Sequence, residues 1–258
     1  MIHTIDHVVI LVSDLAAAAA DYTALGFTVT PGGEHIDGAT HNALVVFADD
    51  AYLELIAFKR PAPEHHWYRH SAVGEGLIDF ALLPTMIEAD LAAARERGLA
   101  IEGPFPGGRL RPDGQQVAWQ LGRAPTPDLP FLCADVTPRA LRVPAGAARI
   151  HANGVTGIVG VTVAVADLGI SVARYRALLG MAERGGPPAL SAARTAAFAP
   201  GDTTITLATP DDDIDTELSA RLASRGEGPF ALALRGVDQA ATFDLSLAHG
   251  ARMELVEE

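Results

Sequence analysis

The chain has 258 residues, a net charge of −13 and a single cysteine. This length allows one large domain or two of ordinary size, the acidic balance argues against binding to a nucleic-acid backbone, and one cysteine excludes an internal disulfide and any multi-cysteine metal site. The N-terminal run MIHTIDHVVILV is too short to span a bilayer and lacks a basic segment, so we expect a cytoplasmic protein without membrane or nucleic-acid partners.

The first predicted elements form a βαβββ module. The apolar run at 5–12 predicts a strand, Asp14 stands in the N-cap position of an Ala-rich helix, and Gly26 ends that helix. Three shorter strand-like runs follow between Gly, Pro and Asp turn signals, and the last of them is YLELIAF at 52–58.

A fainter copy follows the first module. GLIDFALLP at 76–84 predicts a strand, IEADLAAARERGL at 87–99 predicts a helix, and GQQVAWQL and PFLCADV predict two more strands. The spacing from His7 to Gly26 equals that from Asp79 to Gly98, so Asp79 aligns with His7.

The third module repeats the first more clearly. IVGVTVAVADL at 158–168 matches IDHVVILVSDL at 5–15, with Gly160 in the place of His7, and AAFAPGDTTITLAT matches VVFADDAYLELIAF, with Thr206 in the place of Glu54. A truncated fourth copy covers 229–257 and has Ala231 at the His7 position.

The four modules predict an α+β fold in which two pairs of modules form two cups. The first pair is expected over residues 1–145 and the second over residues 146–258. The stretch at 137–154 joins them, and Arg139 and Arg142 are expected to tie this join to the body by salt bridges and carbonyl contacts.

Modules that open with IDHVVILV and close with YLELIAF resemble the vicinal oxygen chelate superfamily, which includes glyoxalase I, extradiol dioxygenases and bleomycin-resistance proteins. The motifs HNALVVF, RLRPDGQQVAW, PFLCADVTPRALRVP and HANG are similar to those of its glyoxalase-like proteins. The resemblance implies that each pair of modules curls into a cup-shaped half-barrel. In metal-dependent members, the first and fourth strands of the modules supply His and Glu ligands to a divalent ion.

The resemblance implies that His7 and Glu54 are ligands or acid–base groups of the first cup, with Asp79 as a third candidate ligand. One His and two carboxylates would suit Mn, Fe, Mg or Zn. Alternatively, His7 and Glu54 hydrogen-bond each other or a substrate in a metal-free pocket. The second pair of modules lacks these residues, so we expect it not to chelate.

Other side chains are predicted to surround the same cup. Arg109 and Arg111 would form a fork that stabilises an oxyanion, or one of them would neutralise Glu54 or Asp79. The candidate substrate-binding residues are His41, Asn42, Trp67, Tyr68, His70 and Trp119.

The sequence favours an enzyme of the lyase, isomerase or hydrolase type that acts on a small oxygenated or carbonyl-bearing metabolite. A metal-free protein that sequesters a drug or metabolite, as the bleomycin-resistance relatives do, is the alternative. Extradiol dioxygenation ranks lower, because no second His occupies a matching first-strand position. The oligomeric state stays open.

Overall fold

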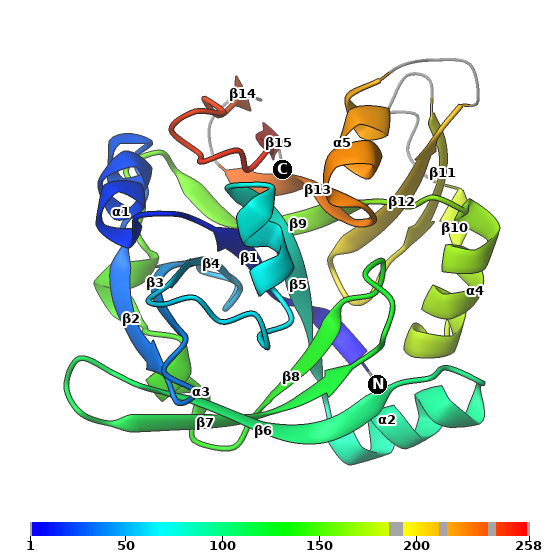
Figure 1. Cartoon of the computed structure of the whole chain (residues 1–258), viewed down its shortest axis with the longest axis horizontal. Coiled ribbons are helices and arrows are strands. Elements are labelled where there is room, and N and C mark those ends of the chain that lie inside the picture. Colours follow the sequence, from blue (N-terminus) through cyan, green and yellow to red (C-terminus); the bar gives the residue numbers. More distant parts are fainter. Residues whose placement is uncertain (1, 186–192, 212–215, 237–240, 257–258) are drawn as a thin grey trace.

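Two β-sheets organise the computed structural model, which describes residues 2–185, 193–211, 216–236 and 241–256 (Figure 1). The first sheet is a closed barrel with the strand order β1-β4-β3-β2-β6-β7-β8-β5. Its strands are β1 (Ile2–Leu11), β2 (Thr30–His35), β3 (Thr40–Val46), β4 (Tyr52–Phe58), β5 (Gly76–Pro84), β6 (Glu102–Leu110), β7 (Gln116–Arg123) and β8 (Phe131–Asp135).

The second sheet has seven strands in the order β10-β11-β12-β9-β13-β15-β14. Its strands are β9 (Val155–Ala164), β10 (Arg184–Gly185), β11 (Ala193–Phe198), β12 (Thr204–Pro210), β13 (Gly228–Gly236), β14 (Ala241–Thr242) and β15 (Met253–Val256). The predicted α+β fold of paired, cup-shaped modules is confirmed, and the first pair closes fully into a barrel through a short contact between β2 and β6.

Short helices connect the strands, and their ends follow the sequence signals. The helices are α1 (Leu15–Ala24), α2 (Ile87–Glu96), α3 (Arg139–Arg142), α4 (Leu168–Leu179) and α5 (Glu217–Arg225), with 3₁₀ turns η1 (Tyr68–Ala72) and η2 (Gly146–Arg149). Asp14 accepts hydrogen bonds from the backbone N–H groups of Ala16 and Ala17 and so caps α1, as predicted. Gly180 ends α4 at a φ of 67°, in the left-handed region that favours glycine. No helix among the described residues is long and apolar enough to cross a membrane.

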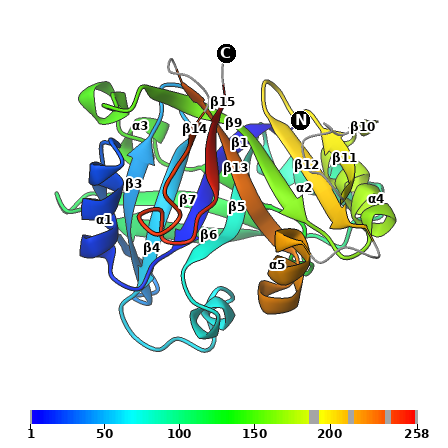
Figure 2. The ribbon, with the colours of Figure 1, turned by 90° about the horizontal axis from the view of Figure 1, so that it is seen from above.

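The outer face of the barrel packs against the second sheet. Val8 and Ile10 of β1 belong to the same buried cluster as Val161 and Val163 of β9, and β5 contacts β13 directly. Figure 2 shows β9 and β13 beside β1 and β5. Because side chains alternate along a strand, the other face of β1 directs His7 into the barrel.

A β-bulge recurs at the same place in all four modules. One residue of the strand has no partner opposite it, and the next residue occupies the position that His7 holds in β1. The unpaired residues are Asp6, Ile78, Val159 and Phe230, and the residues after them are His7, Asp79, Gly160 and Ala231. The strand register therefore confirms the alignment that the sequence spacing predicts.

Candidate functional site

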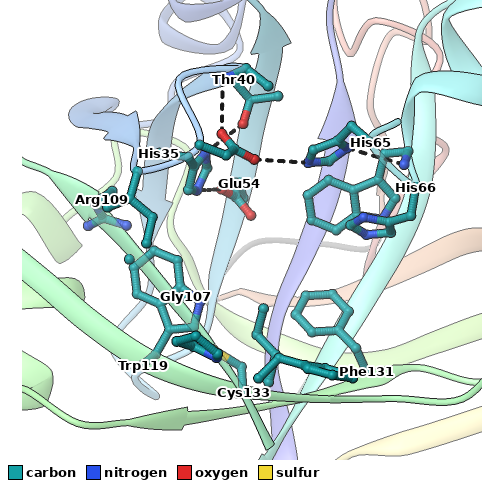
Figure 3. A pocket seen from close by; sticks show the side chains of 18 of the residues that line it. His35, Thr40, Glu54, His65, His66, Gly107, Arg109, Trp119, Phe131 and Cys133 are labelled. Carbon is teal, nitrogen blue, oxygen red and sulfur yellow. Dashed lines mark hydrogen bonds and ion pairs between the residues drawn. The ribbon is translucent and has the colours of Figure 1, made fainter. Parts of the chain in front are cut away.

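The barrel interior holds a cavity of about 670 Å³, which is the size of a pocket for a drug-sized molecule. Figure 3 shows Arg109 and Trp119 toward one side of this cavity and His65, His66 and Phe131 toward the other. His7, Glu54 and His35 also line it. Four strands thus bring titratable groups into one space.

His7 is held between a carboxylate and an aromatic ring. Its Nδ1 lies 2.6 Å from Oδ2 of Asp6, and its ring stacks on Tyr52 with centroids 4.6 Å apart. Neighbouring residues on a regular strand point to opposite faces, but the bulge at Asp6 brings both side chains together. We assign the His7 proton to Nδ1 because Asp6 is an acceptor. The lone pair on Nε2 is then free to act as a base.

Asp6 is fully buried and belongs to an ion network with the chain that joins the two sheets. Arg142 donates to both Asp6 oxygens at 2.7 and 3.0 Å, and Arg139 donates to Oδ1 at 2.7 Å. Both arginines also pair with Asp135. Burial alone would raise the pKa of Asp6, but Arg142 and His7 hold it well below its usual value. The predicted salt bridges of Arg139 and Arg142 are confirmed.

Glu54 lies between two imidazoles. Its Oε2 is 3.6 Å from Nε2 of His7, its Oε1 is 3.5 Å from Nε2 of His35, and Asn42 donates to Oε1 at 2.6 Å. Burial tends to raise the pKa of Glu54, but His35, His7, Asn42 and Arg109 together lower it. Burial also lowers the pKa of His35. At neutral pH the site therefore has an ionised Glu54 beside a neutral His35.

Arg109 places a buried cation in the same cavity. It is 3% exposed, one of its terminal nitrogens donates to the Arg142 carbonyl at 2.8 Å, and its buried Nε has no partner among the described residues. Burial lowers the pKa of Arg109. Its guanidinium therefore has donor capacity left for a substrate oxygen.

The predicted arginine fork does not form. β6 ends at Leu110, so Arg111 belongs to the following turn, where it pairs with Asp113 at 2.9 Å and donates to the Leu141 carbonyl. Arg111 does not line the cavity. Both arginines point toward α3, where Arg109 donates to the Arg142 carbonyl and Arg111 to the Leu141 carbonyl, but only Arg109 also reaches the cavity.

The six predicted substrate-binding residues divide into two groups. Trp67 and Trp119 line the cavity, and Asn42 fixes Glu54. The structure places the other three, His41, Tyr68 and His70, away from the cavity.

The local structure explains why each of these three side chains lies away from the cavity. His41 points to the opposite face of β3 from Asn42. Tyr68 packs on Phe58 with centroids 5.1 Å apart, beside a separate hollow. His70 is buried and accepts from Arg69, and burial together with Arg69 lowers the pKa of His70 to about 3.

The structure does not bring Asp79 together with His7 and Glu54. Trp67 Nε1 and the Phe80 backbone N–H each donate to its carboxylate at 2.8 Å, and it borders a second, smaller cavity behind Trp67. Among the described residues, no group of three or more His, Cys, Asp or Glu side chains is arranged to hold an ion. The expected metal set does not fit this arrangement, so we assign no step to a metal ion.

The environment of Asp79 predicts a pH-dependent stability. Burial raises the pKa of Asp79 from 3.8 to about 6, against the opposing effect of the Trp67 hydrogen bond. The folded protein therefore retains a proton that the unfolded chain releases, so the contribution of Asp79 to the free energy of unfolding should fall as pH rises between about 4 and 6. The lowered pKa values of Asp6 and Glu54 act in the opposite direction, but they act in both proteins, so thermal melting from pH 4 to 7 should show the wild type losing stability relative to Asp79→Asn as pH rises. A difference between the two proteins that does not change with pH would contradict the assignment.

Three site residues carry no clear sequence signal. Asp6 enters the site only through the bulge, and His35 reaches it because β2 ends opposite Arg109 of β6. Arg123, the last residue of β7, extends over the rings of Trp67 and Phe131. The local sequence pattern predicts none of these positions, since each depends on strand register.

Comparisons with known proteins agree with this architecture. A hypothetical protein from Staphylococcus aureus is 14% identical, with a TM-score of 0.75, and the match covers 98% of this chain and 99% of that one. A mutant of 4-hydroxymandelate synthase from Streptomyces coelicolor is 17% identical, with a TM-score of 0.66 and coverage of 92% and 72%. At these identities the likeness shows the fold alone.

The sequence itself gives the family. No curated protein matches the chain. The family model described as a glyoxalase-like domain matches residues 5–179, which is more than half of the chain. The protein therefore belongs to the glyoxalase-like domain family, within the vicinal oxygen chelate superfamily.

Proposed function

We propose that the protein is a cytoplasmic enzyme that moves a proton at a carbon next to a carbonyl group, the opening step of many isomerase and lyase reactions. The observation that carries the proposal is the arrangement around one point in the barrel cavity. The Asp6–His7 pair, the ionised Glu54 and the buried Arg109 all border the same space. A base, a proton shuttle and an oxyanion partner are the parts that such a reaction requires.

The distances support a shared role for His7 and Glu54. Their facing atoms are 3.6 Å apart, too far for a strong hydrogen bond. A substrate atom can therefore approach both at about 2.8 Å. Glu54 would remove the proton and His7 Nε2 would receive or return it. Arg109 would stabilise the negative charge that develops on the carbonyl oxygen.

Deuterium exchange tests this proposal without knowledge of the natural substrate. Aliphatic and aromatic methyl ketones are incubated with the protein in D₂O, and loss of the methyl signal is followed by ¹H NMR. The wild type should accelerate exchange of at least one ketone, and His7→Ala and Glu54→Gln should each slow it by about 10²–10⁴-fold. Thr206→Ala, at the Glu54 position of the second sheet, is the matched control and should leave the rate unchanged.

Equal rates in the wild type and Glu54→Gln would contradict the proposal. So would the absence of acceleration for every ketone.

A metal-free binding protein is the second candidate, favoured by the aromatic lining of the cavity from Trp67, Trp119 and Phe131. Binding of a ligand that is recovered unchanged, with no exchange of its acidic hydrogens, would support that candidate.

A further inference from the structure

We propose that the substrate of this cavity is an uncharged aromatic carbonyl compound with two or more fused rings; this inference rests on the proposed proton-transfer function. It is carried by three features of the cavity: its ring-lined walls, its balance of charge and its volume.

Ring contacts run along one wall of the cavity. Tyr52 stacks on His7, His7 meets Phe131 edge-on at 5.3 Å, Phe131 lies 5.9 Å from Trp67, and Trp67 lies 4.4 Å from His66. The wall thus runs from the acid–base groups toward the cavity rim.

A second pair of rings lies apart from this wall. Trp119 meets His35 edge-on at 5.9 Å, and Figure 3 shows Trp119 and Phe131 on different sides of the cavity. A flat ring system between the two sides can stack or make edge contacts with both, and each favourable aromatic pair contributes about 0.5–1.5 kcal/mol beyond its buried area. An aliphatic ring of equal size lacks that contribution.

The charges of the cavity are already balanced. Arg142 is neutralised by Asp6 and Asp135, and Arg60 pairs with Glu64 at the rim. The other charged side chains that line the cavity are Arg109 and Arg123 on one hand and Glu54 and Asp37 on the other, so two positive charges face two negative ones. Arg109 is close enough to Glu54 to lower the pKa of that carboxyl, and Arg123 interacts electrostatically with Asp79 and Asp37. A ligand carboxylate at Arg109 would add a second negative charge beside Glu54 in a buried site, where like charges repel strongly.

Proton transfer from an uncharged ketone keeps this balance. The C–H bond breaks, its proton goes to the Glu54 carboxylate, and the electron pair of the bond moves onto the carbonyl oxygen near Arg109. Glu54 becomes neutral as the substrate becomes an enolate, so the total charge of the site does not change. Arg109 then interacts more strongly with the transition state than with the ground state, as catalysis requires.

The volume favours a molecule larger than a short-chain oxo compound. A cavity of about 670 Å³ lies within the range of about 300–1,000 Å³ that holds drug-sized ligands. A three- or four-carbon metabolite would leave most of the ring surface uncovered. A bicyclic ketone can reach from the acid–base groups to Trp67.

Three probes separate ring, charge and shape. They are 2-acetylnaphthalene (aromatic and uncharged), 2-naphthoate (the same rings with a carboxylate) and 2-acetyldecalin (uncharged, with the same carbon skeleton but no aromatic ring), each titrated by isothermal calorimetry. The chain has two tryptophans, Trp67 and Trp119, and both line the cavity. Quenching of their fluorescence therefore reports binding at this site.

We expect 2-acetylnaphthalene to bind at least tenfold more tightly than either other probe. Glu54→Gln should keep that binding and tighten binding of 2-naphthoate, because the repelling charge is removed. Gly107→Ala should weaken the binding of 2-acetylnaphthalene, since its Cβ would lie 2.2 Å from Nε1 of Trp119 and displace the ring. Gly185→Ala, whose Cβ meets nothing within 4 Å, is the matched control.

Three results of the titrations would overturn the inference. Equal or tighter binding of 2-naphthoate by the wild type would indicate an anionic substrate, and equal binding of 2-acetyldecalin would remove the role of the aromatic rings. Failure of all three probes to bind would exclude the class. Tight, selective binding of 2-acetylnaphthalene without exchange of its methyl hydrogens would instead refute the proposed function and leave the ligand class standing.

Discussion

Arg142→Met is expected to lower the free energy of unfolding by about 3–5 kcal/mol. Arg142 is 1% exposed and supplies five of the hydrogen bonds that hold Asp6, Asp135 and Tyr52 in place. Methionine keeps much of the side-chain volume but leaves two carboxylates beside the barrel with only Arg139 to neutralise them. Urea unfolding followed by circular dichroism gives the free energy directly.

Arg111→Met is the matched control for this prediction. Arg111 also contacts α3, through the Leu141 carbonyl, but the side chain of its partner Asp113 is 46% exposed, whereas Asp6 is fully buried. Exposed ion pairs contribute little to stability, so this variant should unfold close to the wild type. A similar loss of stability in both variants would show that removing any one positive charge from this region destabilises the protein, and that the buried network around Arg142 has no special role.

The repeat of the modules could be predicted from sequence because it depends on local patterns. Apolar runs, an Asp at the N-cap and a Gly at the helix end recur with fixed spacing, and the structure places His7, Asp79, Gly160 and Ala231 at equivalent positions after a bulge. The third module has Gly160 at this position and still forms the strand and the bulge, although glycine has no reactive side chain. The bulge is therefore a property of the fold, and only the first copy uses it to join an Asp to a His.

The composition of the site could be predicted only in part. His7 and Glu54 follow from the strand pattern, but His35 enters through the pairing of β2 with β6, which joins segments about seventy residues apart. Arg111 does not line the cavity because Asp113 and the Leu141 carbonyl hold its guanidinium, and neither contact can be predicted from the local pattern. Asp79 failed for another reason: a hydrogen bond from Trp67 holds its carboxylate on the far side of that ring.

Asp6→Asn is expected to slow ketone exchange by about 10²–10⁴-fold while the protein remains folded. The carboxylate of Asp6 accepts the His7 Nδ1 proton at 2.6 Å and so keeps the Nε2 lone pair directed at the cavity. An asparagine can instead donate its amide N–H to Nδ1, which moves the imidazole proton to Nε2, so that Nε2 can no longer receive the proton that Glu54 removes. Asp6 is thus a positioning residue that acts through His7.

Asp135→Asn separates this effect from damage to the ion network. Asp135 pairs with the same two arginines as Asp6, but it makes no hydrogen bond to His7 among the described contacts. Both variants should lose stability, and only Asp6→Asn should change the tautomer of His7, which ¹⁵N NMR of the imidazole detects. Binding of 2-acetylnaphthalene should survive in both. Asp135→Asn could instead slow exchange as much as Asp6→Asn, with His7 in the same tautomer in each. Asp6 would then act only by keeping the ion network rigid, and not by setting the tautomer of His7.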